Sequence, residues 1–280
     1  MLTLNYHPPY DWRWVLGFLG ARAVAGVEEV SATVYRRTLT INGYCGLLTV
    51  TPDESLSQVR VSLSEGLLPV QDEVLARIVR LFDLATNPSD MLAHLGSLAA
   101  THPGLRLPGC MDSFEQAVRA VLGQWVSVAR AANLTAKVAQ TWGTPLPGAP
   151  GWWLFPRPAQ LAELTPGMLK PLGMPLKRAE AIITIARLCV AGEFPLAPPQ
   201  DVEQGVKWLI GLPGIGRWTA SYYALRGWQA PDIFLPDDYA VKQRFTGMTV
   251  AQTRHYSTRW QPWRSYALLH IWNNSSWQPT

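Results

Sequence analysis

Alternating hydrophobic and polar positions near the start of the chain predict a small antiparallel sheet. Strands are predicted over residues 2–6, 34–39, 44–51 and 58–63. Asn42-Gly43 lies between two of these runs, and this pair is typical of a two-residue hairpin turn. Hydrophobic positions spaced three and four apart predict helices over residues 11–25 and 70–84. This part of the chain is therefore predicted to be mixed α/β.

From Asp112 onward the pattern is almost wholly helical. Asp112 and Glu115 form a start like a capping box. One face of the helix that follows carries Phe114, Val118, Val121, Leu122 and Trp125. A loop rich in proline and tryptophan, residues 144–158, separates it from later helices. These are predicted over residues 159–163, 165–171, 177–191, 202–210, 217–226, from 239 onward, and 266–272. The expected fold class is α+β.

Three domains are expected from the changes in pattern. The α/β part occupies residues 1–104, and the Pro-Gly pairs at 103–104 and 108–109 mark a linker. A helical lobe over residues 105–230 contains a glycine turn. A proline-containing break at 231–236 then begins a second helical lobe, residues 231–280.

The composition excludes several classes of protein. Of the 280 residues, 48% are hydrophobic, which is enough for a sizeable core, and 13 are tryptophan. Arg13 and Arg22 interrupt the most hydrophobic stretch, and the first residues do not resemble a signal peptide, so we expect a cytoplasmic protein without a membrane segment. Cys45, Cys110 and Cys189 lack metal-ligand spacing, which excludes a zinc knuckle or a four-cysteine iron–sulfur cluster.

The net charge of +4 is unevenly distributed. Residues 1–104 carry seven arginines and ten acidic residues, a net charge of −3, whereas residues 105–280 carry +7. Residues 116–162 and 239–280 contain no acidic residue. The second half of the chain is therefore expected either to present a positive surface to a polyanion or to have an ordinary solvated face.

A glycine turn between two predicted helices is the first candidate for chemistry. Residues 209–220 read Leu-Ile-Gly-Leu-Pro-Gly-Ile-Gly-Arg-Trp-Thr-Ala, and Gly214 and Gly216 are expected in conformations closed to other residues. The following helix would offer free backbone N–H groups to a phosphate. A short turn of this kind also occurs at ordinary corners between helices.

The full set of motifs resembles the helix–hairpin–helix–GPD DNA glycosylases, and within them the bacterial 3-methyladenine DNA glycosylase II type. The resemblance rests on Leu212-Pro-Gly-Ile-Gly216, Phe234-Leu-Pro-Asp-Asp-Tyr239 and the run from Trp263 to Trp272. It extends to Pro8-Pro-Tyr-Asp-Trp12 and to residues 103–109, and so it spans essentially the whole chain.

This resemblance implies an N-terminal domain like half of the TATA-binding fold, then two all-α lobes with the active cleft between them. It implies a monomeric bacterial DNA repair enzyme that acts at the nucleoid on double-stranded DNA with damaged bases. The enzyme would hydrolyse the N-glycosidic bond of a flipped-out alkylated base, with broad specificity, and leave an abasic site. Position 218 holds tryptophan where the glycosylase/lyase members have a catalytic lysine, which implies a monofunctional glycosylase.

Asp238 is the expected catalytic residue. In the matching pattern the second aspartate, just before the aromatic residue, stabilises the oxocarbenium-like sugar and orients or deprotonates the attacking water. A helix N-cap after Pro236 is the structural alternative, and Asp237 fits that cap equally well.

Five aromatic residues match base-pocket positions of the family: Phe18, Trp218, Tyr222, Tyr239 and Trp272. Each taken alone fits a core position. Trp218 and Tyr222 are four residues apart, so they share a helix face. Together the five would form a cage whose electron-rich faces select positively charged bases, at about 0.5–2 kcal/mol per contact.

DNA contacts are expected from two segments. In Gln124-Trp125, the second position is that of the intercalating side chain, where a leucine is familiar; burial on the helix face is the alternative. The hairpin residues Leu212, Gly214, Ile215 and Gly216 would meet the phosphates. The backbone carbonyls of Ile210, Leu212 and Ile215 would hold a monovalent cation, Na⁺ or K⁺, and no other cofactor is expected.

Two other functions also fit parts of the sequence. A non-catalytic module that binds damaged DNA would keep the hairpin but would not need Asp238. An aromatic-rich carbohydrate-binding protein would explain the tryptophans, but neither the hairpin nor the uneven charge.

Overall fold

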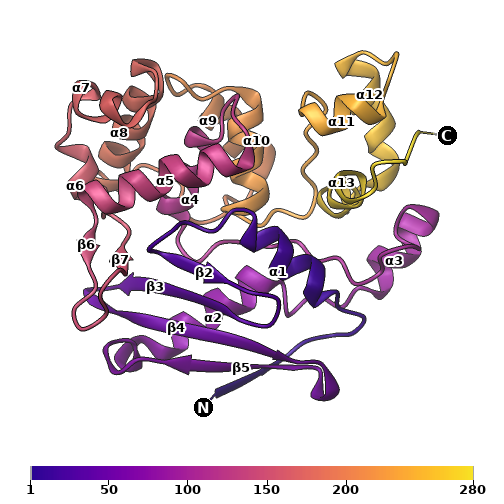
Figure 1. Ribbon diagram of the computed structural model, residues 1–280. Coiled ribbons are helices and arrows are strands. Elements are labelled where there is room, and N and C mark those ends of the chain that lie inside the picture. Colours follow the sequence, from indigo (N-terminus) through magenta and orange to yellow (C-terminus); the bar gives the residue numbers. More distant parts are fainter. Residues whose placement is uncertain (1, 280) are drawn as a thin grey trace.

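The N-terminal part is a five-stranded antiparallel sheet, seen at the bottom of the computed structural model in Figure 1, which describes residues 2–279. The strand order is β1-β5-β4-β3-β2. The strands are β1 (Leu2–Asn5), β2 (Glu28–Val30), β3 (Tyr35–Ile41), β4 (Tyr44–Asp53) and β5 (Gln58–Leu63). The four strands predicted from alternation are confirmed. The three residues of β2 were not predicted, because so short an edge strand shows no alternation to recognise.

The hairpin between β3 and β4 forms at the predicted pair. Ile41 pairs with Tyr44, which leaves Asn42 and Gly43 as the two turn residues. Their φ angles of 50° and 86° are the left-handed values that this turn requires. The turn sets the register of the longest ladder of the sheet.

Two helices cover the sheet, α1 (Trp12–Gly20) and α2 (Gln71–Phe82). The side chain of Asp11 caps α1 by accepting the backbone N–H of Trp14 at 2.8 Å. The helix ends at Gly20, five residues earlier than predicted. Tyr35, Ile78 and Phe82 are among the fully buried side chains of the core between the sheet and these helices.

The rest of the chain is helical, apart from the short pair β6 (Thr144–Pro145) and β7 (Trp153–Leu154). The α-helices are α3 (Ser89–Leu95), α4 (Ser113–Leu122), α5 (Val128–Trp142), α6 (Pro158–Ala162), α7 (Pro166–Leu169), α8 (Leu176–Val190), α9 (Val202–Ile210), α10 (Arg217–Arg226), α11 (Tyr239–Arg244), α12 (Val250–Tyr256) and α13 (Arg264–Asn273). Short 3₁₀ helices are η1 (Glu54–Leu56), η2 (Glu65–Val70), η3 (Gly96–Leu98), η4 (Lys170–Leu172) and η5 (Ser257–Trp260). The α+β fold class is thereby confirmed. None of the described helices combines the length and the hydrophobicity needed to span a bilayer.

Above the sheet the helices stand in two groups (Figure 1): α4 to α10 on one side, and α11 to α13 on the other. The buried hydrophobic core that holds the helices also includes Met91 and Leu95 from α3. Residues 83–99 therefore pack on the last helical group: the Tyr266 hydroxyl donates to Asp83 at 2.8 Å, and the His94 ring hydrogen-bonds the Arg259 carbonyl at 3.0 Å.

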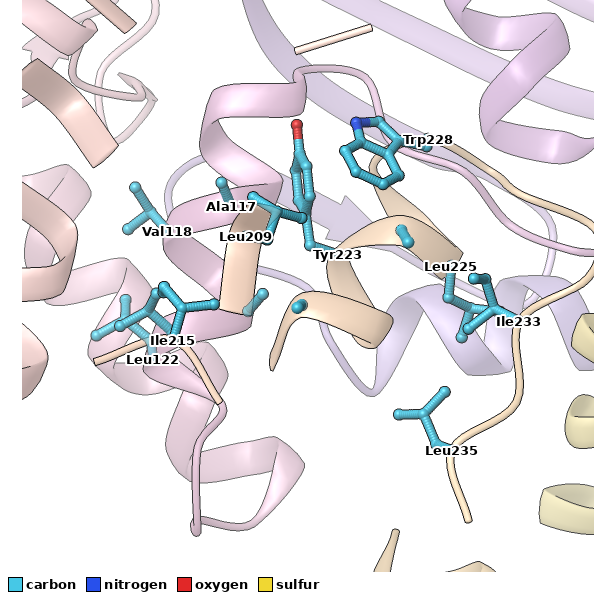
Figure 2. Close-up of a cluster of buried hydrophobic side chains, with 14 of the residues drawn as sticks. Ala117, Val118, Leu122, Leu209, Ile215, Tyr223, Leu225, Trp228, Ile233 and Leu235 are labelled. Carbon is cyan, nitrogen blue, oxygen red and sulfur yellow. The ribbon is translucent and has the colours of Figure 1, made fainter. Parts of the chain in front are cut away.

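Figure 2 shows where the glycine turn joins this core. Ile215, just before α10, lies beside Leu122 of α4, and Tyr223 and Trp228 pack further along. Fully burying side chains of this size contributes about 1.5–3 kcal/mol each. The packing fixes α10, and with it the turn, against α4.

A buried cluster of charges joins the sheet domain to α4. Arg37 pairs with Glu115 at 2.7 Å, and Arg119 pairs with Glu115 at 2.9 Å and with Glu28 at 3.0 Å. Burial raises the pKa of Glu28, but the Arg119 and Arg37 charges lower it by more, to about 2. The sheet domain and α4 each contribute one acidic and one basic side chain, so the four charges of this cluster cancel.

Candidate active site

A cavity of about 440 Å³ lies where the sheet domain meets both helical groups. Its walls come from α1, α4, α5, α10, α11 and α13 and from the residues next to them. Among the side chains of residues 2–279 that line it, Asp238 is the only carboxylate. Trp14 and Phe18 of α1 and the nearby Arg22 line the cavity, so the N-terminal domain supplies part of its wall.

Asp238 is held by four donors. Oδ2 accepts the indole N–H of Trp218 at 2.9 Å, and Oδ1 accepts that of Trp272 at 3.1 Å. Oδ1 also accepts the backbone N–H groups of Ala240 at 3.0 Å and Val241 at 3.4 Å, at the start of α11. Oδ2 accepts no second hydrogen bond from the described residues, so one of its lone pairs stays available. The N-cap and the cavity carboxylate are thus the same residue, so the two interpretations of Asp238 do not exclude each other.

Asp237 does not share the cap. It precedes the N-cap residue, and its Oδ1 is buried with no hydrogen-bond partner in the described part of the chain. The prediction that both aspartates fit the cap equally well is wrong, because the backbone turns into α11 one residue later.

The aromatic residues of the cavity do not form a cage of free faces. Trp218 and Tyr222 stack on each other at 4.9 Å and 7°, which leaves no space for a base between them. Trp14 stacks on Phe18 at 5.2 Å, and the Arg22 guanidinium lies 3.7 Å from the centre of the Phe18 ring. Both Trp218 and Tyr222 line the cavity, so a flat ligand can meet the stacked pair only from outside.

The two remaining pocket positions differ in exposure. Trp272 of α13 lines the cavity and is half-buried, with its indole N–H on Asp238. Tyr239 also lines the cavity but is 78% exposed. The structure thus brings all five aromatic candidates and Asp238 together around one cavity.

Sequence reasoning missed several polar side chains of this cavity, among them Arg22, Gln116, Arg119 and Arg226. Arg226 is buried and donates to the carbonyls of Pro108 and Gly109. Arg22 and Arg226 each follow a predicted pocket aromatic by four residues, and this spacing was the available signal. Burial raises the pKa of the Tyr222 phenol, but the Arg22 and Arg226 charges lower it by more, to about 8.

The glycine turn lies between α9 and α10. Gly214 has a φ of 78°, and a Cβ there would come within 2.9 Å of the Ala181 Cβ, so both backbone and space require glycine. Gly216 has an ordinary φ of −85° and open space around it, so the predicted special conformation is wrong at this position. Gly216 is the N-cap of α10 and has no side chain to cap the helix, which leaves the first N–H groups of α10 free for a ligand.

Trp125 was predicted to lie on the helix that begins near Asp112, but it lies outside α4. α4 ends at Leu122, and Trp125 follows in a turn with φ 54° and is 97% exposed. Its predicted place on the apolar helix face, and the alternative of burial, are both wrong. Gln124 fixes this turn by donating to the Gly214 carbonyl and to Thr219 Oγ1, each at 2.9 Å.

Three backbone carbonyls near the hairpin were predicted to hold a cation. The Leu212 carbonyl accepts the Ile215 N–H at 3.1 Å within the turn. The carbonyls of Ile210 and Ile215 accept no hydrogen bond from any described residue. Residues 2–279 contain no cluster of three or more His, Cys, Asp or Glu side chains that could bind a metal.

Comparison with known proteins agrees with the family resemblance of the sequence motifs. Residues 1–112 match the AlkA N-terminal domain, and residues 118–259 match the HhH-GPD superfamily base excision DNA repair protein family. The chain is 58% identical over 279 residues to DNA-3-methyladenine glycosylase 2 of Escherichia coli strain K12, covering 100% of this chain and 99% of that protein.

The fold is shared with solved structures of low sequence identity. The 3-methyladenine DNA glycosylase from Archaeoglobus fulgidus superposes with a TM-score of 0.84 at 20% identity, covering 98% of this chain and 97% of that one. MBOgg1 in complex with a low-affinity DNA ligand superposes with a TM-score of 0.73 at 16% identity, covering 96% and 93%.

Proposed function

We propose a function on the premise that this chain belongs to the HhH-GPD superfamily of base excision DNA repair proteins and carries an AlkA-type N-terminal domain. It is a DNA glycosylase of the 3-methyladenine type, which hydrolyses the N-glycosidic bond of a flipped-out alkylated base in DNA and leaves an abasic site. The observation that carries the site assignment is Asp238, the single carboxylate among the described residues of the cavity wall, which accepts two indole N–H groups.

Asp238 is the proposed catalytic residue. As the C–N bond breaks, positive charge develops on the sugar, and a fixed carboxylate lowers the energy of that state. Oδ2 accepts one hydrogen bond from the described residues, so it retains a lone pair that can face the sugar or accept a proton from the attacking water. Trp218 occupies the position where a lyase would need an amine, which supports water as the nucleophile and a monofunctional reaction.

The aromatic residues are proposed to bind the base. The outer face of the Trp218–Tyr222 stack offers a platform for a flat ring, with Trp272, Phe18 and Tyr239 around it. Contact by shape and stacking accepts many planar bases, which supports broad specificity.

The DNA contacts are proposed at two neighbouring places. Trp125 extends from the turn held by Gln124, and its exposure suits insertion into the gap that a flipped nucleotide leaves. The open N-terminus of α10 at Gly216, with Leu212, Gly214 and Ile215 in the turn, suits a backbone phosphate.

A monovalent cation is the one cofactor proposed. The carbonyl oxygens of Ile210 and Ile215 are free, and that of Leu212 has a second lone pair, so hard oxygen donors for Na⁺ or K⁺ are present. The ion would add positive charge beside the phosphate-binding turn. The protein is further proposed to act as a monomer in the bacterial cytoplasm, at the nucleoid.

The test of this function is base release from defined duplexes under single-turnover conditions, with the Asp238→Asn variant beside the unmodified protein. We expect the variant to lose at least about 100-fold in rate, since charge stabilisation of this kind contributes several kcal/mol. Its affinity for abasic-site DNA should be retained. Absence of abasic sites with the unmodified protein would favour a non-catalytic DNA-binding module, and strand cleavage trapped by borohydride would refute the monofunctional reaction.

A further inference from the structure

Gln116 has a buried side chain without a partner. It is 3% exposed and lines the cavity that contains Asp238. No residue of the described chain hydrogen-bonds to its carboxamide group, and its N and O atoms are not among the fully buried side-chain atoms that lack a partner, so the group faces the open space of the cavity. A polar side chain in this state inside a ligand cavity points to a hydrogen bond that a ligand completes.

The position of Gln116 is fixed by its neighbours on α4. The preceding residue, Glu115, is locked in the buried charge cluster with Arg37 and Arg119. The Gln116 backbone N–H donates to the Asp112 carbonyl at 3.0 Å, in the first turn of the helix. Because the helix cannot rotate without breaking these ion pairs, the carboxamide is presented to the cavity in a defined place.

Arg22 places a guanidinium group without a carboxylate partner among the described residues in the same wall. Its guanidinium lies on the Phe18 ring and donates to the Phe18 carbonyl at 3.1 Å. No carboxylate of residues 2–279 lies within 4.0 Å of it. Arg119 donates to the Arg22 carbonyl, which ties this segment to α4 and therefore to Gln116. An arginine has donors only, so this wall favours an acceptor oxygen over an amino group.

We propose that Gln116 and Arg22 form a specificity subsite for bases that carry a ring carbonyl next to a ring N–H. The carboxamide oxygen accepts the ring N–H, and the carboxamide NH₂ and the guanidinium donate to the carbonyl oxygen. Hypoxanthine and 7-methylguanine present this edge, whereas 3-methyladenine presents an amino group next to a ring acceptor. The inference rests on the proposed glycosylase function and names two residues that select among its substrates.

Methylated DNA provides an internal comparison, because 7-methylguanine and 3-methyladenine are both cationic and differ at this edge. The full-length protein and a Gln116→Met variant are incubated with the same methylated DNA, and the two free bases are separated by chromatography. Methionine matches the length of glutamine without its hydrogen bonds. A Gln140→Met variant is the matched control, since Gln140 donates to the Ala25 carbonyl at 3.3 Å and does not line the cavity.

We expect Gln116→Met to lower the release of 7-methylguanine about tenfold relative to that of 3-methyladenine, and to lower hypoxanthine excision from a defined duplex similarly. Affinity for abasic-site DNA, which lacks the base, should stay within about twofold. Equal loss on all bases would mean a structural role and would overturn the subsite, as would an unchanged ratio of the two bases.

A second variant tests the subsite in case Gln116→Met disturbs the packing of α4. Arg22→Gln removes the guanidinium charge, and Arg22 does not belong to α4. This variant should shift the ratio of 7-methylguanine to 3-methyladenine release in the same direction as Gln116→Met, and an unchanged ratio would count against the subsite. Release of neither base by the unmodified protein would refute the proposed function itself. Release by the unmodified protein with unchanged ratios in both variants would refute the subsite alone.

Discussion

The two indole N–H groups on Asp238 allow the positioning of the carboxylate to be tested without removing it. Trp272 donates to Oδ1 at 3.1 Å from α13, whereas Asp238 begins α11. Trp272→Phe keeps a flat aromatic ring, smaller than indole, and deletes this one donor. The variant therefore separates the hydrogen bond from the stacking surface.

The expected size of the effect follows from the remaining donors. A hydrogen bond to a charged group contributes about 1.5–3 kcal/mol, and every 1.4 kcal/mol of transition-state stabilisation is about tenfold in rate. The Ala240 and Val241 N–H groups still hold Oδ1, and Trp218 still holds Oδ2. We therefore expect a loss near the lower limit, about tenfold in the single-turnover rate.

The assay measures base release from two duplexes, one with a cationic lesion and one with a neutral lesion, at saturating protein. Both should slow by the same factor, because the lost bond acts on Asp238 and not on the base. Trp228→Phe is the control, since its indole N–H donates to the Pro195 carbonyl at 2.8 Å and Trp228 does not line the cavity. It should lower stability and leave the rate unchanged. A rate for Trp272→Phe within twofold of the unmodified protein would refute the reasoning, and slowing of the cationic lesion alone would assign Trp272 to cation recognition instead.

Three further predictions concern the exposed wedge, the cavity phenol and the buried charge cluster. Trp125→Ala should weaken binding to abasic-site DNA in fluorescence anisotropy by about 1–3 kcal/mol, with no change in thermal unfolding; a fall in melting temperature would contradict its exposed position. Ultraviolet titration should show one tyrosine ionising near pH 8 that is absent in Tyr222→Phe. Because the folded pKa of Tyr222 lies below its unfolded value, its stabilising effect is present at high pH and is lost as the pH falls through about 8, so urea denaturation should find the variant more destabilised at pH 10 than at pH 7. Glu28→Gln should lower the unfolding free energy at pH 7 by about 3–5 kcal/mol, since Arg37 and Arg119 lose a buried partner. The Glu28 carboxylate stabilises the fold above its unfolded pKa, and this effect is lost as the pH falls through about 2. If the difference in unfolding free energy between Glu28→Gln and the unmodified protein persisted undiminished below this pH, the role assigned to the Glu28 charge would be refuted.

The sheet could be predicted because its signals are local. Alternation marks four of its strands, and Asn42-Gly43 marks the turn that fixes their register. The break between α4 and α5 could not be predicted in the same way. The apolar spacing continues from Leu122 to Trp125, and only Gly123 interrupts it, so periodicity alone extends the helix. The positive φ of Trp125 depends on the hydrogen bonds of Gln124 to the distant Gly214 and Thr219, which no local pattern contains.

The residues of the cavity likewise fall into those that could be predicted from sequence and those that could not. Asp238 and the aromatic residues were predicted because they lie in recognisable motifs. Gln116 and Arg22 lie in no motif, and it is the packing of the sheet domain against α4 that places both side chains in the cavity wall. A buried glutamine on a helix is indistinguishable in sequence from an exposed one.

The electrostatics of the cavity argue against selection by positive charge alone. A cationic base on the Trp218 platform would gain about 0.5–2 kcal/mol from the ring face. It would also meet Arg22 and Arg226, which have no carboxylate partner among the described residues, and of the cavity arginines only Arg119 is neutralised, by Glu28 and Glu115. Among the described residues that line the cavity, Asp238 is the one further carboxylate, and it faces the sugar in the proposed reaction. The attraction of the rings and the repulsion of the guanidinium groups therefore oppose each other, and we infer a pocket that accepts flat bases whether they are charged or neutral.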